Sequence, residues 1–333
     1  MNCRRKPFMK FIRSEIIGCG HYAPAKNLTN DDMAKIVETS DEWISTRTGI
    51  KARRIVEDEV TSDLASEAAQ MAIKNSGLSA ADIELIVLAT ITPDVTTPST
   101  AIKVGKRIGV NSGTPAFDIS AACSGFIYAL TMADNMIRLG QVKTALVIGA
   151  ESLSKITDWT DRNTCVLFGD GAGAVVLRAC EGNGNSADVG VLSTSIYADG
   201  THFDNLKTTG GVATTQTAGT LTMDGKEVFK YAINALAQGA ENSMAKAEIS
   251  VDEIDWLLPH QANIRIIDGV GKKLNLPDSK VIVNIAGHGN TSAASIPLAL
   301  SEKVNDGTIK KGDVIVMTAM GAGFTWGGAV VRL

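Results

Sequence analysis

The chain has 333 residues, 44% hydrophobic and 20% charged, which is enough apolar sequence for a large core in one domain or two coupled ones. Its formal net charge of −4 is not concentrated in one segment, which argues against a nucleic-acid-binding protein. No apolar run reaches the roughly 18 residues that cross a bilayer, so we expect no membrane segment.

The chain begins with a basic stretch, Met1–Arg13, that contains an Arg-Arg pair and so resembles the start of an export signal. An export signal also needs an apolar region, which Ser14, Glu15 and Gly18 interrupt. The cysteines are Cys3, Cys19, Cys123, Cys165 and Cys180. They are odd in number and lack CxxC spacing, which predicts neither a disulfide framework nor a zinc site. We expect a cytoplasmic protein without a bound metal.

Apolar strand patterns alternate with helical patterns along the chain, which is typical of an α/β protein. Three pairs of segments recur about 170 residues apart: Ser79–Thr90 with Ser250–His260, Ser124–Gly140 with Ser292–Gly307, and Ala145–Ala150 with Val314–Ala319. A fourth pair, 173–178 and 328–333, has a smaller offset, so the first half carries extra residues around 151–168. The repeat predicts two similar halves, 1–182 and 183–333, packed as one body with a site where equivalent loops meet.

In the first half, a short strand at Phe117 leads through small residues to Cys123, at the start of a long amphipathic helix. Unpaired N–H groups and the dipole at a helix N-terminus favour a thiolate, which predicts a lowered thiol pKa. A buried structural cysteine is the alternative, and it is the commoner role of this residue type. Position alone leaves both interpretations open.

A nucleophilic cysteine needs a basic or electrostatic partner. His260 follows the apolar strand 254–259, at the strand end where ligands bind in α/β sheets. Asn290 precedes the helix that is equivalent to the helix of Cys123, so the repeat predicts that these two segments face each other. His288 is the rival base, although its position between two glycines indicates a turn. His21 and His202 are expected in loops.

Two glycine-rich stretches have different interpretations. Phe168–Ala174 resembles a nucleotide-binding fingerprint but leads into a strand instead of a helix, so that interpretation fails. Gly321–Gly328 lies between the last two strands. Its backbone N–H groups are suited to stabilising an oxyanion, and a plain tight turn is the alternative.

Taken together, seven segments resemble, in order, those of β-ketoacyl-acyl carrier protein synthase III, the initiating condensing enzyme of bacterial fatty acid synthesis. They are TSDEWISTRTGI (39–50), AFDISAACSGF (116–126), DRNTCVLFGDGAGAVVL (161–177), MDGKEVFK (223–230), HQANIRI (260–266), GHGNTSAASIP (287–297) and GAGFTWG (321–327). The resemblance runs from about Ile16 to Leu333. It implies a thiolase-like fold, in which two duplicated α/β halves pack as a five-layered αβαβα body.

The resemblance implies a catalytic triad of Cys123, His260 and Asn290. Cys123 would take an acyl group from acyl-CoA. The N–H groups of Cys123 and Ala322 would stabilise the oxyanion that forms, and the family has a glycine at the position of Ala322. His260 and Asn290 would then stabilise the enolate formed when malonyl-acyl carrier protein loses carbon dioxide. No metal or redox cofactor is implied.

The resemblance also implies binding residues. Trp43 and Arg162 would sandwich the CoA adenine, and Arg47 would contact a nucleotide phosphate. The side chains expected to dock the acidic carrier protein or CoA phosphates are Lys230, Arg265, Lys272 and Lys273. An ordinary solvated surface is the alternative for each lysine. The family implies a homodimer.

The sequence indicates least about which acyl primer the enzyme uses. In the loop Thr90–Pro98, many relatives carry a phenylalanine that limits the primer pocket across the dimer interface. This chain has Thr97 at the position of that phenylalanine. We therefore predict that primers longer than acetyl are accepted.

Three alternatives to this function exist. The first is a specialised member of the family that uses a longer or diacid primer, as in biotin-precursor, quinolone or polyketide synthesis. Thiolase and hydroxymethylglutaryl-CoA synthase share the fold, but no cysteine after Cys180 is available as a second thiolase cysteine. A non-enzymatic acyl-carrier-binding protein is disfavoured by the intact triad.

Overall fold

The computed structural model describes residues 11–333, so Cys3 and most of the basic Met1–Arg13 segment lie outside the described residues. A five-stranded sheet has the order β1-β7-β6-β4-β5. Its strands are β1 (Phe11–Tyr22), β4 (Ile86–Ala89), β5 (Ala116–Ile119), β6 (Thr144–Glu151) and β7 (Gly171–Gly182). The strands β4, β5 and β6 are parallel, whereas β7 runs antiparallel to β6 and to β1. All eight residues of β6 are buried, as expected for a strand covered on both faces.

A four-stranded sheet has the order β11-β12-β13-β8. Its strands are β8 (Gly190–Ala198), β11 (Trp256–Pro259), β12 (Val314–Gly321) and β13 (Thr325–Arg332). The strands β11 and β12 are parallel, and β13 is antiparallel to both of its neighbours. An isolated bridge between Leu257 and Val281 extends the β11 side of this sheet.

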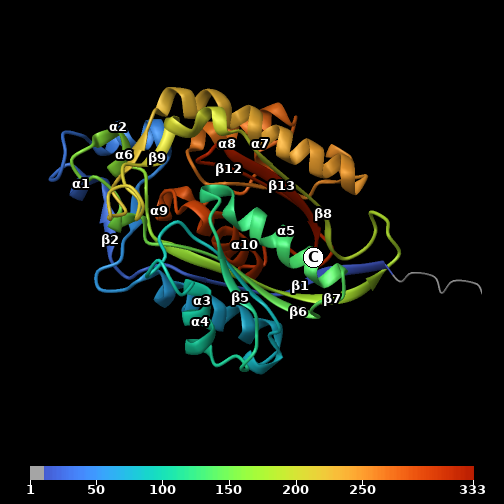
Figure 1. Ribbon diagram of the computed structural model, residues 1–333. Helices are drawn as coiled ribbons and strands as arrows, with labels where there is room; N and C mark the ends of the chain where they lie inside the picture. The colour runs from blue at the N-terminus through green and yellow to red at the C-terminus, as the bar shows by residue number, and fades with distance from the viewer. Residues whose placement is uncertain (1–10) are drawn as a thin grey trace, which may run out of the picture.

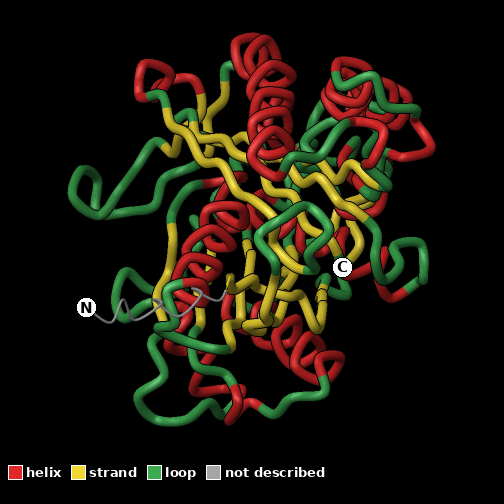
Figure 2. Tube along the Cα trace, turned by 90° about the vertical axis from the view of Figure 1, so that its right-hand side faces the viewer, coloured by secondary structure: helices red, strands yellow, loops and turns green. Residues whose placement is uncertain are grey.

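Helices cover both sheets and fill the space between them, which gives five layers (Figure 1). The helices of these layers are α3 (Thr61–Ser76) and α4 (Thr100–Ile108), α5 (Gly125–Arg138) and α10 (Ser295–Asn305), and α7 (Gly225–Ala247) and α8 (Ile264–Lys273). The first pair covers the five-stranded sheet, the second lies between the sheets, and the third covers the four-stranded sheet. Figure 2 shows the same strands between outer helices after a turn of 90°. The αβαβα prediction is confirmed.

Shorter elements complete the fold. They are β2 (Asn27–Thr29), β3 (Ala52–Arg54), β9 (Leu206–Thr208), β10 (Leu221–Met223), α1 (Asn30–Met33), α2 (Asp41–Thr48), α6 (Arg162–Cys165), α9 (Ile285–His288) and the 3-10 turns η1 (Ala80–Asp82), η2 (Ala122–Ser124), η3 (Leu153–Lys155), η4 (Gly200–Asn205), η5 (Val251–Glu253), η6 (Asp278–Lys280) and η7 (Ser292–Ala294). No helix within residues 11–333 has the length and apolar character that a membrane span requires.

Equivalent elements recur in the two parts of the chain. The turn η2 precedes α5 as η7 precedes α10, and each contains a residue with positive φ, 45° at Ala122 and 49° at Ser292. The connection between β6 and β7 spans 152–170, whereas that between β12 and β13 spans only 322–324. The smaller offset of the last repeated pair therefore arises in this connection.

The central layer is held close to the five-stranded sheet by a glycine. A side-chain carbon added at Gly149 of β6 would lie 2.1 Å from the backbone oxygen of Ala293 in η7. Any larger residue would push η7 away from β6. This close approach brings the residues around Ser292 against the end of β6, where the candidate site lies.

Candidate active site

Cys123 is the middle residue of η2, directly before α5, and only 9% of it is exposed. Burial raises the pKa of the Cys123 thiol to about 12. A hydrogen bond with Ser292 opposes this rise, whereas the charge of Glu151 increases it. The prediction of a lowered thiol pKa is therefore wrong. Loss of hydration is the largest cause of this shift, so the resting side chain is a thiol and its proton needs an acceptor during any nucleophilic attack.

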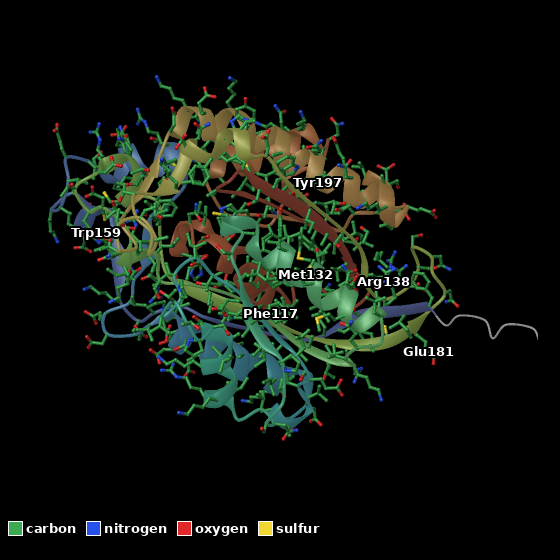
Figure 3. The ribbon with its side chains drawn as sticks, viewed as in Figure 1. Phe117, Met132, Arg138, Trp159, Glu181 and Tyr197 are labelled. Atoms are coloured by element: carbon green, nitrogen blue, oxygen red, sulfur yellow. The ribbon has the colours of Figure 1, made fainter. Side chains whose placement is uncertain are left out.

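A cavity of about 1190 Å³ lies beside this turn. Ala121 and Ala122 form part of its wall, together with Ala322 from the β12–β13 connection and Phe117 from β5. Figure 3 labels Phe117. The segment that contains β9 supplies the opposite boundary, with residues from Phe203 to Thr215. The cavity thus meets both sheets at the position of the cysteine turn.

The end of β12 lies directly against the backbone of Cys123. A side-chain carbon added at Gly321 would lie 2.5 Å from the Cys123 nitrogen. The Thr325 hydroxyl lies 3.1 Å from the Ala121 carbonyl oxygen and 3.0 Å from that of Ala322, which ties the connection to η2. Ala322 itself is not in the left-handed region, so its methyl group adds no backbone strain. These contacts place the Cys123 backbone next to the end of β12, whose following residue Ala322 lines the cavity.

His260 immediately follows β11 and is 2% exposed. Its Nδ1 lies 2.8 Å from the hydroxyl oxygen of Ser295, and that oxygen also accepts the backbone N–H of Gln261 at 2.9 Å. The Ser295 hydroxyl hydrogen is then free to be donated to Nδ1, which leaves the ring proton of His260 on Nε2. Burial lowers the His260 pKa to about 3, so the ring is neutral and acts as a hydrogen-bond donor through Nε2.

Asn290 lies between α9 and η7 and is 7% exposed. Its backbone N–H donates to Leu167 O at 2.8 Å, and its carbonyl oxygen accepts from Gly169 N at 3.0 Å. Its side-chain Oδ1 accepts the N–H of Ser292 at 2.9 Å. Because Oδ1 is occupied, the Nδ2 amide group is the end of this side chain available as a donor.

The segment 290–295 joins the three residues of the predicted triad. It contains Asn290, its Ser295 hydroxyl orients His260, and its turn η7 lies against the turn η2 that holds Cys123. The structure therefore brings together the cysteine, histidine and asparagine that the sequence predicted as partners.

The other histidines lie outside this arrangement. His288 is the last residue of α9 instead of part of a turn, and its Nε2 lies 2.8 Å from Glu302 Oε1. His21 lies in β1, so the prediction of a loop is wrong for it. His202 lies in η4, where its ring stacks 4.9 Å from that of Phe324. Within residues 11–333, no group of three His, Cys, Asp or Glu side chains is arranged to hold a metal ion.

The residues predicted to bind the CoA nucleotide lie together around one indole ring. Trp43 is on α2, and the Arg47 guanidinium carbon lies 4.7 Å from its ring centroid. The guanidinium carbon of Arg162, from α6, lies 5.0 Å from the same ring. Arg162 also donates to Glu38 O at 3.0 Å. Two planar cations beside an indole form a surface suited to a planar, charged ligand.

The predicted docking cations lie on the outer helices α7 and α8. Arg265 is exposed, with its guanidinium carbon 5.2 Å from the ring centroid of Phe229. Lys230 Nζ lies 3.6 Å from Glu227 Oε2 on the exposed surface of α7. Lys272 and Lys273 end α8 and are exposed. All four thus share the helical layer that covers the four-stranded sheet.

Thr97 lies on the exposed loop after β4, before α4. Thr90, Ile91 and Thr96 from this loop line the cavity, whereas Thr97 is not among the lining residues of its own chain. This position is compatible with a role across a subunit interface and leaves the primer prediction open.

Sequence reasoning missed Glu151, Ser292 and Ser295. Glu151 ends the apolar strand β6 and is fully buried. An acidic residue directly after the apolar run Ala145–Ala150 was a detectable signal, because a buried carboxylate requires partners. The two serines carried no such signal, since their roles depend on which side chains the fold places beside them.

Comparison with known proteins agrees with this geometry. The family model described as 3-Oxoacyl-[acyl-carrier-protein (ACP)] synthase III matches residues 117–200, and its C-terminal counterpart matches residues 244–333. The β-ketoacyl-[acyl-carrier-protein] synthase III of Rhodospirillum centenum is 58% identical over 96% of this chain and 99% of its own length. That of Paramagnetospirillum magneticum is 55% identical over 97% and 99%.

Solved structures give the same result. The 3-oxoacyl-[acyl-carrier-protein] synthase III of Aquifex aeolicus VF5 has a TM-score of 0.89 and 48% identity, covering 96% of this chain and 100% of its own. The priming β-ketosynthase of the R1128 polyketide pathway also has a TM-score of 0.89, at 33% identity, covering 100% and 99%. The fold is therefore shared with a polyketide enzyme, but the sequence is more similar to the synthase III enzymes named above.

Proposed function

The chain belongs to the β-ketoacyl-[acyl-carrier-protein] synthase III family, and we propose that Cys123, His260 and Asn290 carry out its reaction. It is an acyltransferase that initiates fatty acid synthesis. An acyl-CoA primer is joined to malonyl-acyl carrier protein, which yields 3-oxoacyl-acyl carrier protein, CoA and carbon dioxide. The observation that carries the assignment of roles is the segment 290–295, which contains Asn290, hydrogen-bonds with His260 through Ser295 and packs against the turn of Cys123.

In the first half-reaction, the Cys123 sulfur attacks the thioester carbonyl of the acyl-CoA. The negative oxygen that develops is stabilised by the backbone N–H groups of Cys123 and Ala322. Support comes from the close contact between the end of β12 and the Cys123 nitrogen. Expulsion of CoA leaves the acyl group as a thioester on Cys123.

In the second half-reaction, malonyl-acyl carrier protein loses carbon dioxide. The negative charge moves to the thioester oxygen, where His260 Nε2–H and the Asn290 Nδ2 amide donate hydrogen bonds. The resulting carbanion attacks the acyl carbonyl on Cys123, forms the carbon–carbon bond and releases the cysteine. A neutral His260 suits this role, because its Nε2 already carries the proton that it must donate.

We assign CoA and carrier binding to two separate groups of cations. Trp43, Arg47 and Arg162 would hold the CoA nucleotide, with stacking as the main contribution. The acidic carrier protein would dock on the outer helices α7 and α8, whose cations are Lys230, Arg265, Lys272 and Lys273. Such exposed charges chiefly raise the association rate and make it sensitive to salt.

We infer that the enzyme is a homodimer that pairs through β5. This strand forms one edge of the five-stranded sheet, and its unpaired backbone groups offer a template for a second strand. Two large apolar side chains nearby in the chain are about half exposed, Val95 at 53% and Ile102 at 50%. Burial of this surface would also bring the Thr97 loop to a subunit interface.

We further infer a cytoplasmic setting. The four described cysteines, Cys19, Cys123, Cys165 and Cys180, are unpaired. A reducing compartment keeps the Cys123 thiol available for acyl transfer.

The primer range is tested with a panel of acyl-CoA esters of increasing chain length. We expect primers longer than acetyl to acylate Cys123 and to be condensed, because Thr97 leaves space that a phenylalanine would fill. Thr97→Phe should lower kcat/KM for the longer primers by about 10-fold or more, while acetyl-CoA is used as before. The measurement is condensation rate with malonyl-acyl carrier protein. Exclusive use of acetyl-CoA by the unmodified enzyme would contradict the prediction.

The orientation of His260 is tested by Ser295→Ala. Removing the hydroxyl leaves Nδ1 without its partner and frees the ring to adopt the other tautomer. We expect malonyl decarboxylation to fall by roughly 10- to 100-fold, as for loss of a buried hydrogen bond of about 1–3 kcal/mol. Ser301→Ala is the matched control, since Ser301 is a buried serine of α10 that contacts His21 instead. Equal rates in the two variants would show that Ser295 does not orient His260.

A further inference from the structure

A fully buried carboxylate, Glu151, has no part in the mechanism above, although it lies between two segments of the active site. Its Oε2 accepts hydrogen bonds from the Thr92 hydroxyl at 2.7 Å and the Thr90 hydroxyl at 3.1 Å. The Ile91 N–H lies 3.2 Å from Oε1 and 3.1 Å from Oε2. Oε1 also accepts the Ser292 hydroxyl at 3.2 Å. One side chain thus binds three consecutive residues of a loop and one residue of η7.

The strand register explains why Glu151 reaches this loop. The strands β4 and β6 are parallel neighbours, with Ala89 opposite Gly149. Glu151 lies two residues beyond Gly149, so it is level with Ile91, which lies two residues beyond Ala89. The end of β6 therefore lies beside the start of the loop Thr90–Pro98.

The part of the loop that Glu151 binds faces the cavity beside the turn of Cys123. Thr90 and Ile91 both line that cavity. Under the function proposed above, the acyl primer occupies this space while it is bound to Cys123. The position of these two residues relative to the cysteine therefore helps to set which acyl chains fit.

The outer part of the same loop is attached separately. The carboxylate of Asp94 accepts the backbone N–H of Ser62 at 2.9 Å and the Ser62 hydroxyl at 2.6 Å, both from α3. Lys103 Nζ of α4 lies 2.6 Å from the same carboxylate. Loss of the Glu151 contacts would thus release the cavity-lining start of the loop while its outer part stays on α3 and α4.

The hydrogen bonds of Glu151 hold the donors as well as the carboxylate. A carboxylate taken out of water costs free energy unless hydrogen bonds satisfy its oxygens. Burial raises the Glu151 pKa to about 7, and the bonds from the loop and from η7 oppose that rise. An apolar side chain at this position would accept none of these bonds. The start of the loop would then lose its attachment to β6 and η7.

We propose that Glu151 is a positioning residue that determines primer specificity, a role that rests on the function proposed above. It ties the start of the loop to η7, which packs against the turn of Cys123. The distance from the nucleophile to this wall of the cavity is thereby fixed. A fixed wall contacts the acyl chains that fit and excludes those that do not. A released wall does neither, so the enzyme would discriminate less between primers.

The test measures kcat/KM for condensation over a panel of straight-chain CoA esters from acetyl to octanoyl. Glu151→Gln keeps the length of the side chain but directs an amide donor at the donors of the loop. We expect the ratio of kcat/KM between the best and the poorest primer to fall by about 10-fold or more. The KM for malonyl-acyl carrier protein, measured with the best primer, should stay unchanged.

Thr92→Val removes the shortest contact between the loop and the carboxylate. It should also reduce discrimination, by a smaller factor, because the Thr90 and Ile91 contacts with Glu151 remain. The double variant should discriminate no less than Glu151→Gln alone, since both substitutions break the same attachment. This lack of additivity distinguishes a positioning role from two independent losses of packing.

Asp134→Asn is the matched control. Asp134 is also a buried carboxylate whose pKa burial raises, but it lies on α5 and accepts the Ser14 hydroxyl at 2.7 Å. Its variant should discriminate between primers as the unmodified enzyme does.

Unchanged discrimination in Glu151→Gln or in Thr92→Val would overturn the proposal. An equal loss in Asp134→Asn, or additive losses in the double variant, would overturn it as well, because either result would assign the effect to general packing. Acylation of the unmodified enzyme by the same panel, read by intact mass, reports on the proposed function separately. An enzyme that none of these esters acylates would contradict the condensing reaction and not the role of Glu151 alone.

Discussion

Cys123→Ala should abolish the acyl adduct and lower the condensation rate by at least about 10⁴-fold, because no other group can carry the acyl chain between the two substrates. The experiment exposes the enzyme to the accepted acyl-CoA and measures its intact mass. The unmodified enzyme should gain one acyl group, and the alanine variant none. The side chain is small and nearly buried, so the substitution should leave the fold intact.

Cys165→Ala is the matched control for this experiment. Cys165 is also a buried thiol, and its pKa is likewise raised, to about 11, chiefly by burial. It ends α6 and packs in a separate hydrophobic cluster with Met33 and Ile44. The control should acquire the adduct at the unmodified rate. An adduct that persists in Cys123→Ala would assign the nucleophile to another residue, and a chain that no CoA ester labels would contradict the condensing reaction.

The repeat made much of the architecture predictable from sequence. The paired strands at 145–150 and 314–319 correspond to β6 and β12, the central strands of the two sheets. The repeat also predicted that the segments of Cys123 and Asn290 face each other, and the turns η2 and η7 of these segments pack together. Element boundaries were less accurate, since α10 begins at Ser295 and the preceding residues form the separate turn η7.

The electrostatics of the site could not be predicted in the same way. The position of Cys123 before α5 was correct, but the pKa of its thiol depends on burial by η7 and the end of β12, which are distant in sequence. His260 was found from its place after β11. Its neutral state and tautomer depend on Ser295, which only the folded chain places beside it.

His260→Ala should separate the two half-reactions. The substitution removes the Nε2–H donor and leaves the Asn290 amide alone to stabilise the enolate oxygen. Loss of one donor of this kind costs about 10²- to 10³-fold in rate. We therefore expect malonyl decarboxylation to fall by that factor. Acylation of Cys123 should be much less affected, since the Nε2–H of His260 acts on the enolate oxygen, which forms only after acylation.

His288→Ala is the matched control, because His288 was the rival base in the sequence and its Nε2 contacts Glu302 instead of the site. It should decarboxylate malonyl-acyl carrier protein at the unmodified rate.

Because the pKa of His260 is lowered to about 3, its ring stays neutral throughout pH 5–9 and should contribute no titration to decarboxylation in that range. Normal decarboxylation by His260→Ala would show that the Asn290 amide alone is enough to stabilise the enolate oxygen. A loss of decarboxylation in His288→Ala would show that His288 is the donor to the enolate oxygen. The hydrogen bond between His288 and Glu302 would then have to break during the reaction.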